Sequence, residues 1–111
     1  MTAFAAYPDK PIKMVVPYAA GGGADGAARI VAQRLGIALG QQVIIDNRAG
    51  GGGVIGADAV AKAAADVYTV LFDASAFAVN PVLRKLPFDP RKDFVPVSLV
   101  VTAPNILVVP P

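Results

Sequence analysis

The feature that most constrains the fold is a strand-like run that leads through glycines into a helix-like segment. The apolar run at 12–16 is followed by Pro17-Tyr18-Ala19-Ala20 and then by Gly21-Gly22-Gly23-Ala24-Asp25. A similar junction follows, where the apolar run at 43–45 leads into Asn47-Arg48-Ala49-Gly50-Gly51-Gly52-Gly53. The first N–H groups of a helix have no partner inside it and carry a partial positive charge. Because glycine lets a ligand approach this backbone closely, the sequence predicts two glycine-lined mouths suited to an anion or carboxylate.

Composition limits the classes of protein that the chain can belong to. At 111 residues it is a single domain by length, and its 55% hydrophobic and 16% charged content leaves little polar surface for a compact monomer. We therefore expect a surface that a partner covers. The net charge of +2 comes from dispersed Lys and Arg, and aromatic residues are too scattered for base stacking, so we expect no nucleic-acid partner.

Two residue types with much of the common catalytic chemistry are absent from the sequence. The chain has no Cys and no His, which excludes thiol nucleophiles, disulfides, imidazole bases and the usual zinc or haem ligands. Its acidic residues are all Asp, and Asp66, Asp89 and Asp93 stand in turn-like settings where a short side chain bonds its own backbone. We expect no enzyme activity, no cofactor and no metal site.

Apolar runs alternate with helical patterns along the chain. We expect strands at 12–17, 42–46 and 68–73, helices at 24–39 and 55–65, a short helix near 78–85 and an extended segment at 95–109. In the first helix, the spacing predicts that Ile30, Val31, Leu35 and Ala38 face the sheet. The alternation predicts the α/β class, a three-layer sandwich with a mainly parallel sheet and right-handed crossovers. The strand pattern at 94–102 and the apolar run at 106–109 predict an open sheet edge.

Two other interpretations of the glycines stay open from the residues alone. Gly21 to Gly26 also satisfies G-x-G-x-x-G, and Asp46 follows about twenty residues on, as in a dinucleotide-binding Rossmann-like domain. Against this, residues 17–20 separate the strand from the first glycine, and Gly50 to Gly53 has no role in that fingerprint. The glycines could also serve only close packing of helices on the sheet.

Several motifs in order resemble the solute-binding proteins of tripartite tricarboxylate transporters, often called Bug proteins. The resemblance covers nearly the whole chain. The matching stretches are Tyr7-Pro8-Asp9-Lys10-Pro11-Ile12, Val16-Pro17-Tyr18-Ala19-Ala20-Gly21-Gly22-Gly23-Ala24-Asp25, Asp46-Asn47-Arg48-Ala49-Gly50-Gly51-Gly52-Gly53 with residues 55–63, Asn80-Pro81, Leu86-Pro87-Phe88-Asp89-Pro90 with Lys92-Asp93-Phe94, and Pro96-Val97-Ser98-Leu99 with Pro104-Asn105.

The resemblance implies a fold, a location and a role. The chain, 1–111, would be the N-terminal part of one incomplete lobe of a type II periplasmic binding protein, truncated at the crossover to a second lobe. The protein would bind a small carboxylate in the periplasm and deliver it to membrane transporter subunits, without covalent chemistry. Ala3-Phe4-Ala5 has the small-x-small form of a signal-peptidase site, which is consistent with a removed leader. Since lobe closure traps the solute in such proteins, we expect this chain alone to bind carboxylates weakly or not at all.

The resemblance also assigns the ligand-binding residues. The carboxylate would rest on backbone N–H groups at the two glycine mouths, with Tyr18 as a pocket wall or a core aromatic, and with Ser75 and Asn80 adding polar contacts after the third strand. The full set is Tyr18, Ala20, Gly21, Gly22, Gly23, Ala24, Asp25, Gly51, Gly52, Gly53, Ser75 and Asn80. Because a carboxylate beside an anion site repels the ligand, we expect Asp25 to cap the helix start or to contact an ammonium group.

Some residues depart from the family pattern. Members usually have proline at Ala20, threonine or serine at Ala24, larger apolar residues at Gly26 and Ala27, and glycine at Val67. The missing hydroxyl at Ala24 removes a ligand or capping hydrogen bond, so affinity is expected to differ from that of the family. A further alternative is a scaffold that binds no solute and forms a homodimer through its exposed edge strand.

Overall fold

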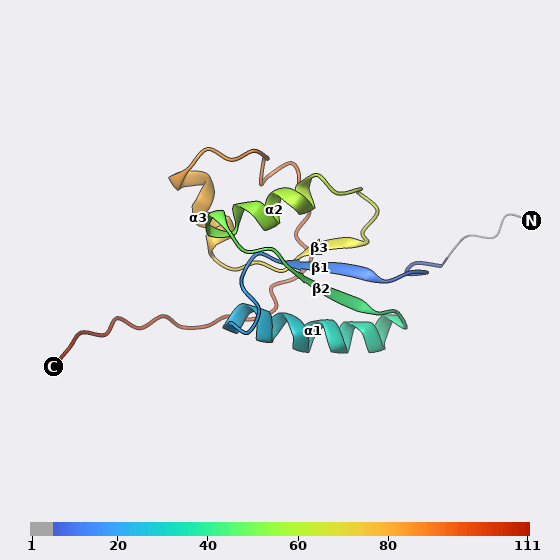
Figure 1. The fold of residues 1–111 in the computed structure, drawn as a ribbon, viewed down its shortest axis with the longest axis horizontal. Coiled ribbons are helices and arrows are strands. Elements are labelled where there is room, and N and C mark those ends of the chain that lie inside the picture. The colour runs from blue at the N-terminus through green and yellow to red at the C-terminus, as the bar shows by residue number, and fades with distance from the viewer. Residues whose placement is uncertain (1–5) are drawn as a thin grey trace, which may run out of the picture.

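The fold is a three-stranded parallel sheet with helices on both faces (Figure 1). The computed structural model describes residues 6–111. The order of elements is β1 (Ile12–Val16), α1 (Gly23–Leu39), β2 (Val43–Asn47), the 3-10 turn η1 (Gly51–Gly53), α2 (Val54–Ala61), β3 (Thr69–Leu71) and α3 (Ala76–Leu83). This confirms the expected α/β class and the parallel strands. The proposed leader remnant at 3–5 lies outside the described residues.

Strand order explains why the two faces are covered by different helices. β1 lies in the centre, with β2 on one side and β3 on the other, and Val15 is in register with Asp46 and with Leu71. Right-handed crossovers to opposite sides of one central strand place their helices on opposite faces. Figure 1 shows α1 below the sheet, and α2 and α3 above it.

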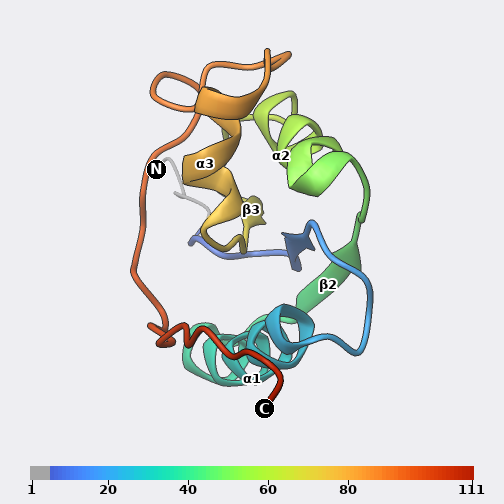
Figure 2. The same ribbon diagram turned by 90° about the vertical axis from the view of Figure 1, so that its left-hand side faces the viewer.

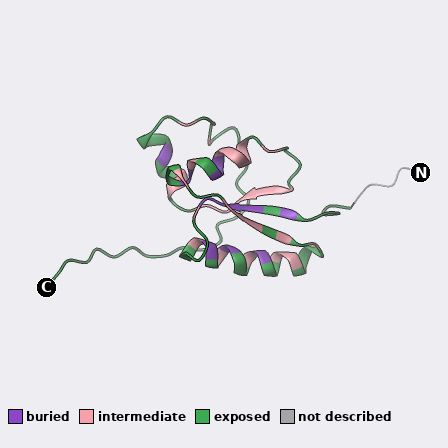
Figure 3. Ribbon diagram, viewed as in Figure 1, coloured by how far each residue is buried: buried purple, intermediate pink, exposed green. Residues whose placement is uncertain are grey.

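The core is built around the central strand. Met14 and Val16 pack against Ala28 and Ala32 of α1, with partly buried apolar side chains from the neighbouring strands around them. Figure 3 shows the buried positions concentrated along β1 and on the inner face of α1. Apolar side chains on both faces of a parallel strand lose their contact with water, which is the main favourable term in folding.

The face that α1 turns to the sheet differs from the expected stripe. Ala28 and Ala32 are its buried residues, whereas Ile30 is 66% exposed. Residues 28 and 30 lie on opposite sides of a helix, since each residue advances the helix by about 100°. Small alanines let the helix approach the sheet closely, with Val31 and Leu35 filling the flanks. Ala38 is exposed as well, so the expectation that Ile30 and Ala38 face the sheet was wrong.

The second half of the chain has shorter elements than the sequence indicated. α2 ends at Ala61 rather than 65, β3 spans only Thr69–Leu71, and α3 begins about two residues before the expected helix. Within residues 6–111, no strand follows β3, so the strands expected at 94–102 and 106–109 are absent. No neighbouring strand in the described part of the chain forms hydrogen bonds with these residues. Pro96 and Pro104 have no backbone N–H group and cannot donate a hydrogen bond to a strand. They form the extended tail that runs to the C-terminus in Figure 1.

None of the helices formed by residues 6–111 has the length and apolar character that crossing a bilayer requires.

Candidate functional site

The glycine mouths lie together at one edge of the sheet. β1, β2 and β3 run in parallel, so their carboxyl ends meet at a single edge, and each leads there into a helix or turn. Figure 2 looks at this edge, where α1 and α2 begin on opposite sides of the strands. Gly22 and Gly52 are both exposed. Both glycine segments therefore follow strand ends at the same edge of the sheet, although Gly53 is buried, and their role as a binding site stays a prediction.

The first mouth leaves backbone donors free. Gly22 is the N-cap of α1 and no side chain caps the helix. Within residues 6–111, the amides of Gly22, Gly23 and Ala24 have no acceptor in the chain. A Cβ added at Gly23 would meet nothing within 4 Å, which shows that the space before the helix is open. These amides at the positive end of a 17-residue helix can bind an anion.

Asp25 is a buried anchor of this loop rather than a helix cap. The residue is 2% exposed, and Oδ2 accepts hydrogen bonds from Gly21 N at 2.9 Å and from Arg29 Nε at 2.8 Å. Asn47 Nδ2, at the end of β2, donates to Oδ1 at 2.9 Å. These donors lower the pKa of Asp25 from 3.8 to about 2, with Arg29 contributing most. The Arg29 charge also offsets the repulsion that Asp25 would exert on a bound anion.

The second mouth is a glycine turn held by Asn80 of α3 and by Arg84, the residue after α3. Gly50, Gly51, Gly52 and Gly53 all have positive φ, a conformation that L-residues with a side chain rarely adopt. Two side chains from the second half of the chain secure the turn. Asn80 Nδ2 donates to Gly52 O at 2.9 Å, and Arg84 Nη1 donates to Gly51 O at 2.8 Å.

Tyr18 and Asp73 join the loops after β1 and β3. The Tyr18 hydroxyl donates to Asp73 Oδ1 at 2.7 Å, and Ala74 N donates to the same oxygen at 2.7 Å. Burial, together with the acidic partner, raises the pKa of Tyr18 to about 12, so this hydroxyl stays a donor. Burial also raises the pKa of Asp73. Tyr18 is therefore partly buried at the edge of the site, and its hydroxyl already donates a hydrogen bond to Asp73.

The remaining expected ligand-binding residues lie in different settings. Ala20 is exposed in the loop after β1, and Ser75 is exposed at the start of α3, where its side chain makes no capping hydrogen bond. Asn80 is only 8% exposed, so it supports the second mouth through Gly52 rather than lining an open surface.

Sequence reasoning missed the roles of Asn47, Asp73 and Arg84. Asn47 and Asp73 each stand at or just after the end of a strand, and side chains at that place in a parallel sheet converge on one edge. That signal could have identified them. Arg84 could not be found in this way, because its reach to Gly51 depends on how α3 packs.

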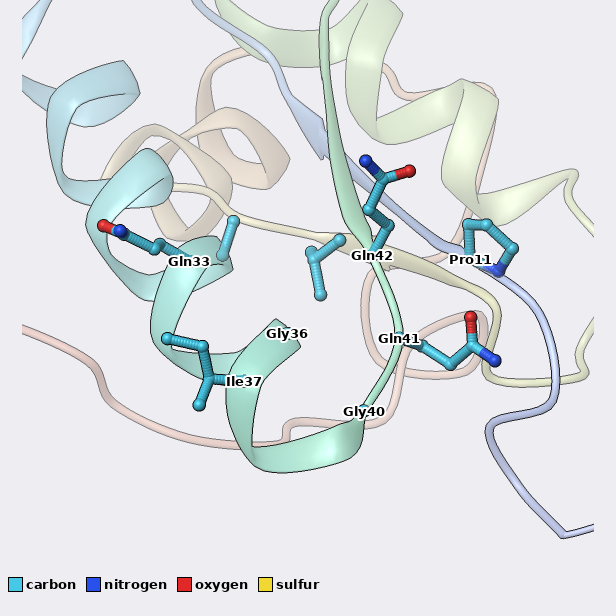
Figure 4. A pocket seen from close by; sticks show the side chains of 9 residues that line it. Pro11, Gln33, Gly36, Ile37, Gly40, Gln41 and Gln42 are labelled. Carbon is cyan, nitrogen blue, oxygen red and sulfur yellow. The ribbon is translucent and has the colours of Figure 1, made fainter.

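A hollow lies at the other end of the sheet. Figure 4 shows it between the end of α1 and the residues before β1 and β2, including Pro11, Gln33, Ile37 and Gln42. The residues that line it carry no charge. Among residues 6–111, no three acidic side chains lie close enough to hold a metal ion. At the carboxyl edge, backbone donors and the polar side chains around them are the groups available for binding.

Comparison with known families gives one match that covers most of the chain. Residues 27–111 match the family described as the tripartite tricarboxylate transporter family receptor. The chain is 48% identical over 108 residues to protein BugT of Bordetella pertussis, covering 95% of this chain and 33% of BugT. It is 45% identical over 106 residues to a UPF0065 protein of Pseudomonas sp. strain P51, covering 95% of this chain and 32% of that protein. The chain thus spans about a third of the length of these relatives.

Solved structures show the same similarity. MatC of Rhodopseudomonas palustris with bound malate superposes with a TM-score of 0.73 at 36% identity, over 85% of this chain and 33% of MatC. The R. palustris protein Rpa4515 with adipate gives a TM-score of 0.73 at 38% identity, over 78% of this chain and 29% of that one. The periplasmic binding protein BugD gives a TM-score of 0.57 at 46% identity, over 59% of this chain and 22% of BugD.

Proposed function

Because the chain belongs to the tripartite tricarboxylate transporter receptor family, we propose that it is part of a periplasmic receptor that binds a small carboxylate and passes it to a membrane transporter. The similar structures that hold malate and adipate support a carboxylate as the ligand. In this proposal residues 1–111 form the N-terminal part of one lobe, and a second lobe completes the solute site. The role is binding and transfer without bond-making chemistry.

The first glycine mouth supplies the main binding energy in this proposal. The carboxylate lies in front of α1 and accepts hydrogen bonds from the amides of Gly22, Gly23 and Ala24, which have no other acceptor among residues 6–111. Hydrogen bonds to a charged group contribute about 1.5–3 kcal/mol each. Tyr18 forms one side of the site, and waters bridge to the second mouth.

The observation that carries the proposal is this row of unsatisfied donors. A helix start usually has a side-chain cap, and α1 has none. Asp25, the residue that could serve as a cap, is directed to Gly21, Arg29 and Asn47 instead. The donors are therefore left to a ligand or to water.

A single substitution can remove one donor without removing the fold. Gly23 is the first residue of α1, where proline is well tolerated, and Gly22 before it is extended, as a residue before proline prefers. Gly23→Pro deletes the amide donor, whereas the matched control Gly23→Ala keeps it and adds a methyl group to open space.

We expect titration of the ¹⁵N-labelled chain with malate or adipate to shift the amide signals of Gly22 and Ala24, with a dissociation constant in the millimolar range because one lobe alone binds weakly. Gly23→Pro should weaken binding about tenfold, and Gly23→Ala should change it little. Equal affinity of the two variants, or shifts confined to residues away from the carboxyl edge, would contradict the proposal. Unfolding midpoints measured for both variants serve as the control for stability.

A further inference from the structure

Asp73 places an acidic side chain with free acceptor capacity at the carboxyl edge of the sheet. It follows β3 and lies beside the loop after β1, where Oδ1 accepts hydrogen bonds from Tyr18 and Ala74. Within residues 6–111, Oδ2 accepts no hydrogen bond from the chain and is not among the buried unpaired atoms. One oxygen is thus fixed in place, and the other has no hydrogen-bond partner among residues 6–111.

No cation of the described chain neutralises Asp73. The salt bridges among residues 6–111 involve Asp25, Asp46 and Asp58, and none reaches Asp73. The arginines around the mouths have other partners, since Arg29 pairs with Asp25, Arg48 pairs with Asp46 and Arg84 donates to Gly51 O. Desolvation by burial raises the pKa of Asp73, as expected for a partly buried carboxylate.

Asp73 also faces the second glycine mouth. A Cβ added at Gly53, the N-cap of α2, would lie 3.9 Å from Asp73 Oδ1. The N-cap of α2 is therefore next to a carboxylate of the chain itself. A second carboxylate on a solute meets repulsion there, whereas a donor group meets an acceptor.

The two mouths thus differ in what they accept. The first offers the free amides of Gly22, Gly23 and Ala24, and its own acid, Asp25, is saturated by donors and paired with Arg29. The second carries the unpaired acid Asp73. A solute that reached both mouths would therefore place a carboxylate at the first and a hydrogen-bond donor at the second.

We propose that Asp73 is a specificity-determining residue, which makes the site prefer a carboxylate solute that also carries an ammonium group, or less strongly a hydroxyl group, over the plain dicarboxylate. This inference rests on the proposed function and names the solute class for the same site. It transfers to Asp73 the ammonium contact that the sequence had suggested for Asp25. An ammonium group gains most because both charge and hydrogen bonding contribute.

Three solutes with the same four-carbon diacid skeleton isolate the substituent. Succinate has no donor on its carbon chain, malate has a hydroxyl and aspartate has an ammonium group. For the unmodified chain we expect the affinity order aspartate, malate, succinate, with about a tenfold difference between the first and the last, measured from the amide shifts of Gly22 and Gly23.

Asp73→Asn removes the charge and keeps an oxygen that can accept from Tyr18 and Ala74, so the loop geometry is retained. We expect succinate to bind more tightly to this variant and aspartate more weakly, each by about three- to tenfold. A purely structural role would change all three affinities in the same direction. Asp66→Asn, in the turn before β3 at the other edge, is the control for net charge and should leave the order unchanged.

The outcomes separate the two proposals. If none of the three solutes shifts the Gly22 and Gly23 amides, the proposed carboxylate site is wrong and the inference fails with it. If the solutes bind but succinate equals aspartate in the unmodified chain, or Asp73→Asn changes both affinities alike, only the role of Asp73 is overturned. The comparison in the unmodified chain decides the matter even where the variant does not fold.

Discussion

Asp25 is a carboxylate next to a loop that the sequence predicts to bind an anion, and its hydrogen bonds explain how the two can be neighbours. Read along the chain, it is a carboxylate beside an anion site. In the structure its oxygens bind Gly21 N, Arg29 Nε and Asn47 Nδ2, so it fixes the glycine loop and ties the end of β2 to the first turn of α1. Its charge is matched by Arg29, which leaves the neighbouring amides free for a ligand.

The lowered pKa of Asp25 predicts a specific dependence of stability on pH. A carboxyl group whose pKa falls from 3.8 unfolded to about 2 folded stabilises the fold above about pH 4, and this contribution is lost as the pH falls through about 2. We expect the difference in unfolding free energy between the unmodified chain and Asp25→Asn to be constant above pH 4 and to shrink between pH 4 and pH 2. Urea unfolding over this pH range measures it, and a difference that stays constant to pH 2 would show that Asp25 is not held by these donors.

Val67 shows a departure from the family pattern that carries a local cost. The resemblance places glycine at this position, and the structure gives Val67 a φ of 66°. A β-branched residue rarely adopts this conformation, whereas glycine adopts it freely. The family pattern, which has glycine at this position, therefore indicated a left-handed turn before β3. In this chain valine occupies that turn, although glycine favours it.

Gly56 in α2 and Gly26 in α1 differ in how closely other residues approach them. In α2, a Cβ at Gly56 would lie 2.7 Å from Pro17 Cβ and 3.0 Å from Arg48 O, so the helix approaches the loops after β1 and β2 too closely for a side chain. In α1, a Cβ at Gly26 would meet nothing within 4 Å. Only the first glycine is required by packing.

We expect Gly56→Ala to destabilise the fold by about 1–3 kcal/mol, because the backbone of Pro17 and Arg48 must move. Gly26→Ala, the matched control in an exposed helix interior, should stabilise it by about 0.5–1 kcal/mol through lower backbone entropy. Chemical denaturation of both variants measures the two free energies. Similar effects of both substitutions would contradict the close approach of α2.

At the level of elements, the sequence predicted β1, α1 and β2 to within about one residue at each end. Their apolar runs are continuous and their glycines mark the ends, so local signals agree. The face of α1 was predicted less well, since Ile30 is exposed and Ala28 is buried. Helical spacing predicts a row of apolar residues along one face of the helix. Which residues of that face contact the sheet depends on how closely the helix can approach it.

The whole molecule is more extended than a compact chain of its length. Its radius of gyration is 15.9 Å, compared with about 13 Å for a compact domain of roughly 100 residues. The tail accounts for this, because Val97 is 87% exposed, Leu99 81% and Leu107 95%. An apolar extended segment without a neighbouring strand offers unpaired backbone groups and apolar side chains to another chain.

We expect this chain to self-associate through the tail as its concentration rises. This is the homodimer that the sequence suggested as an alternative, formed through an exposed edge. Val97→Lys combined with Leu99→Lys should keep the chain monomeric, because charged side chains prevent edge pairing and both positions are free of packing contacts to lose. Light scattering gives the mass of each. A monomeric unmodified chain, or equal association of both chains, would remove the tail as an interface.

The sequence by itself determined the class of fold, the first three elements and the two glycine mouths, because these follow from short-range patterns of apolar residues and from backbone positions that favour glycine. Only the tertiary structure decided what surrounds the mouths. Asn47, Asp73 and Arg84 reach them from other elements, and the amides of Gly22, Gly23 and Ala24 stay free because Asp25 is directed elsewhere. The tail residues also lack a strand partner, which no local pattern reveals. Contacts between residues far apart in the chain depend on how the elements pack, and that packing decides which hydrogen-bonding groups remain for a solute.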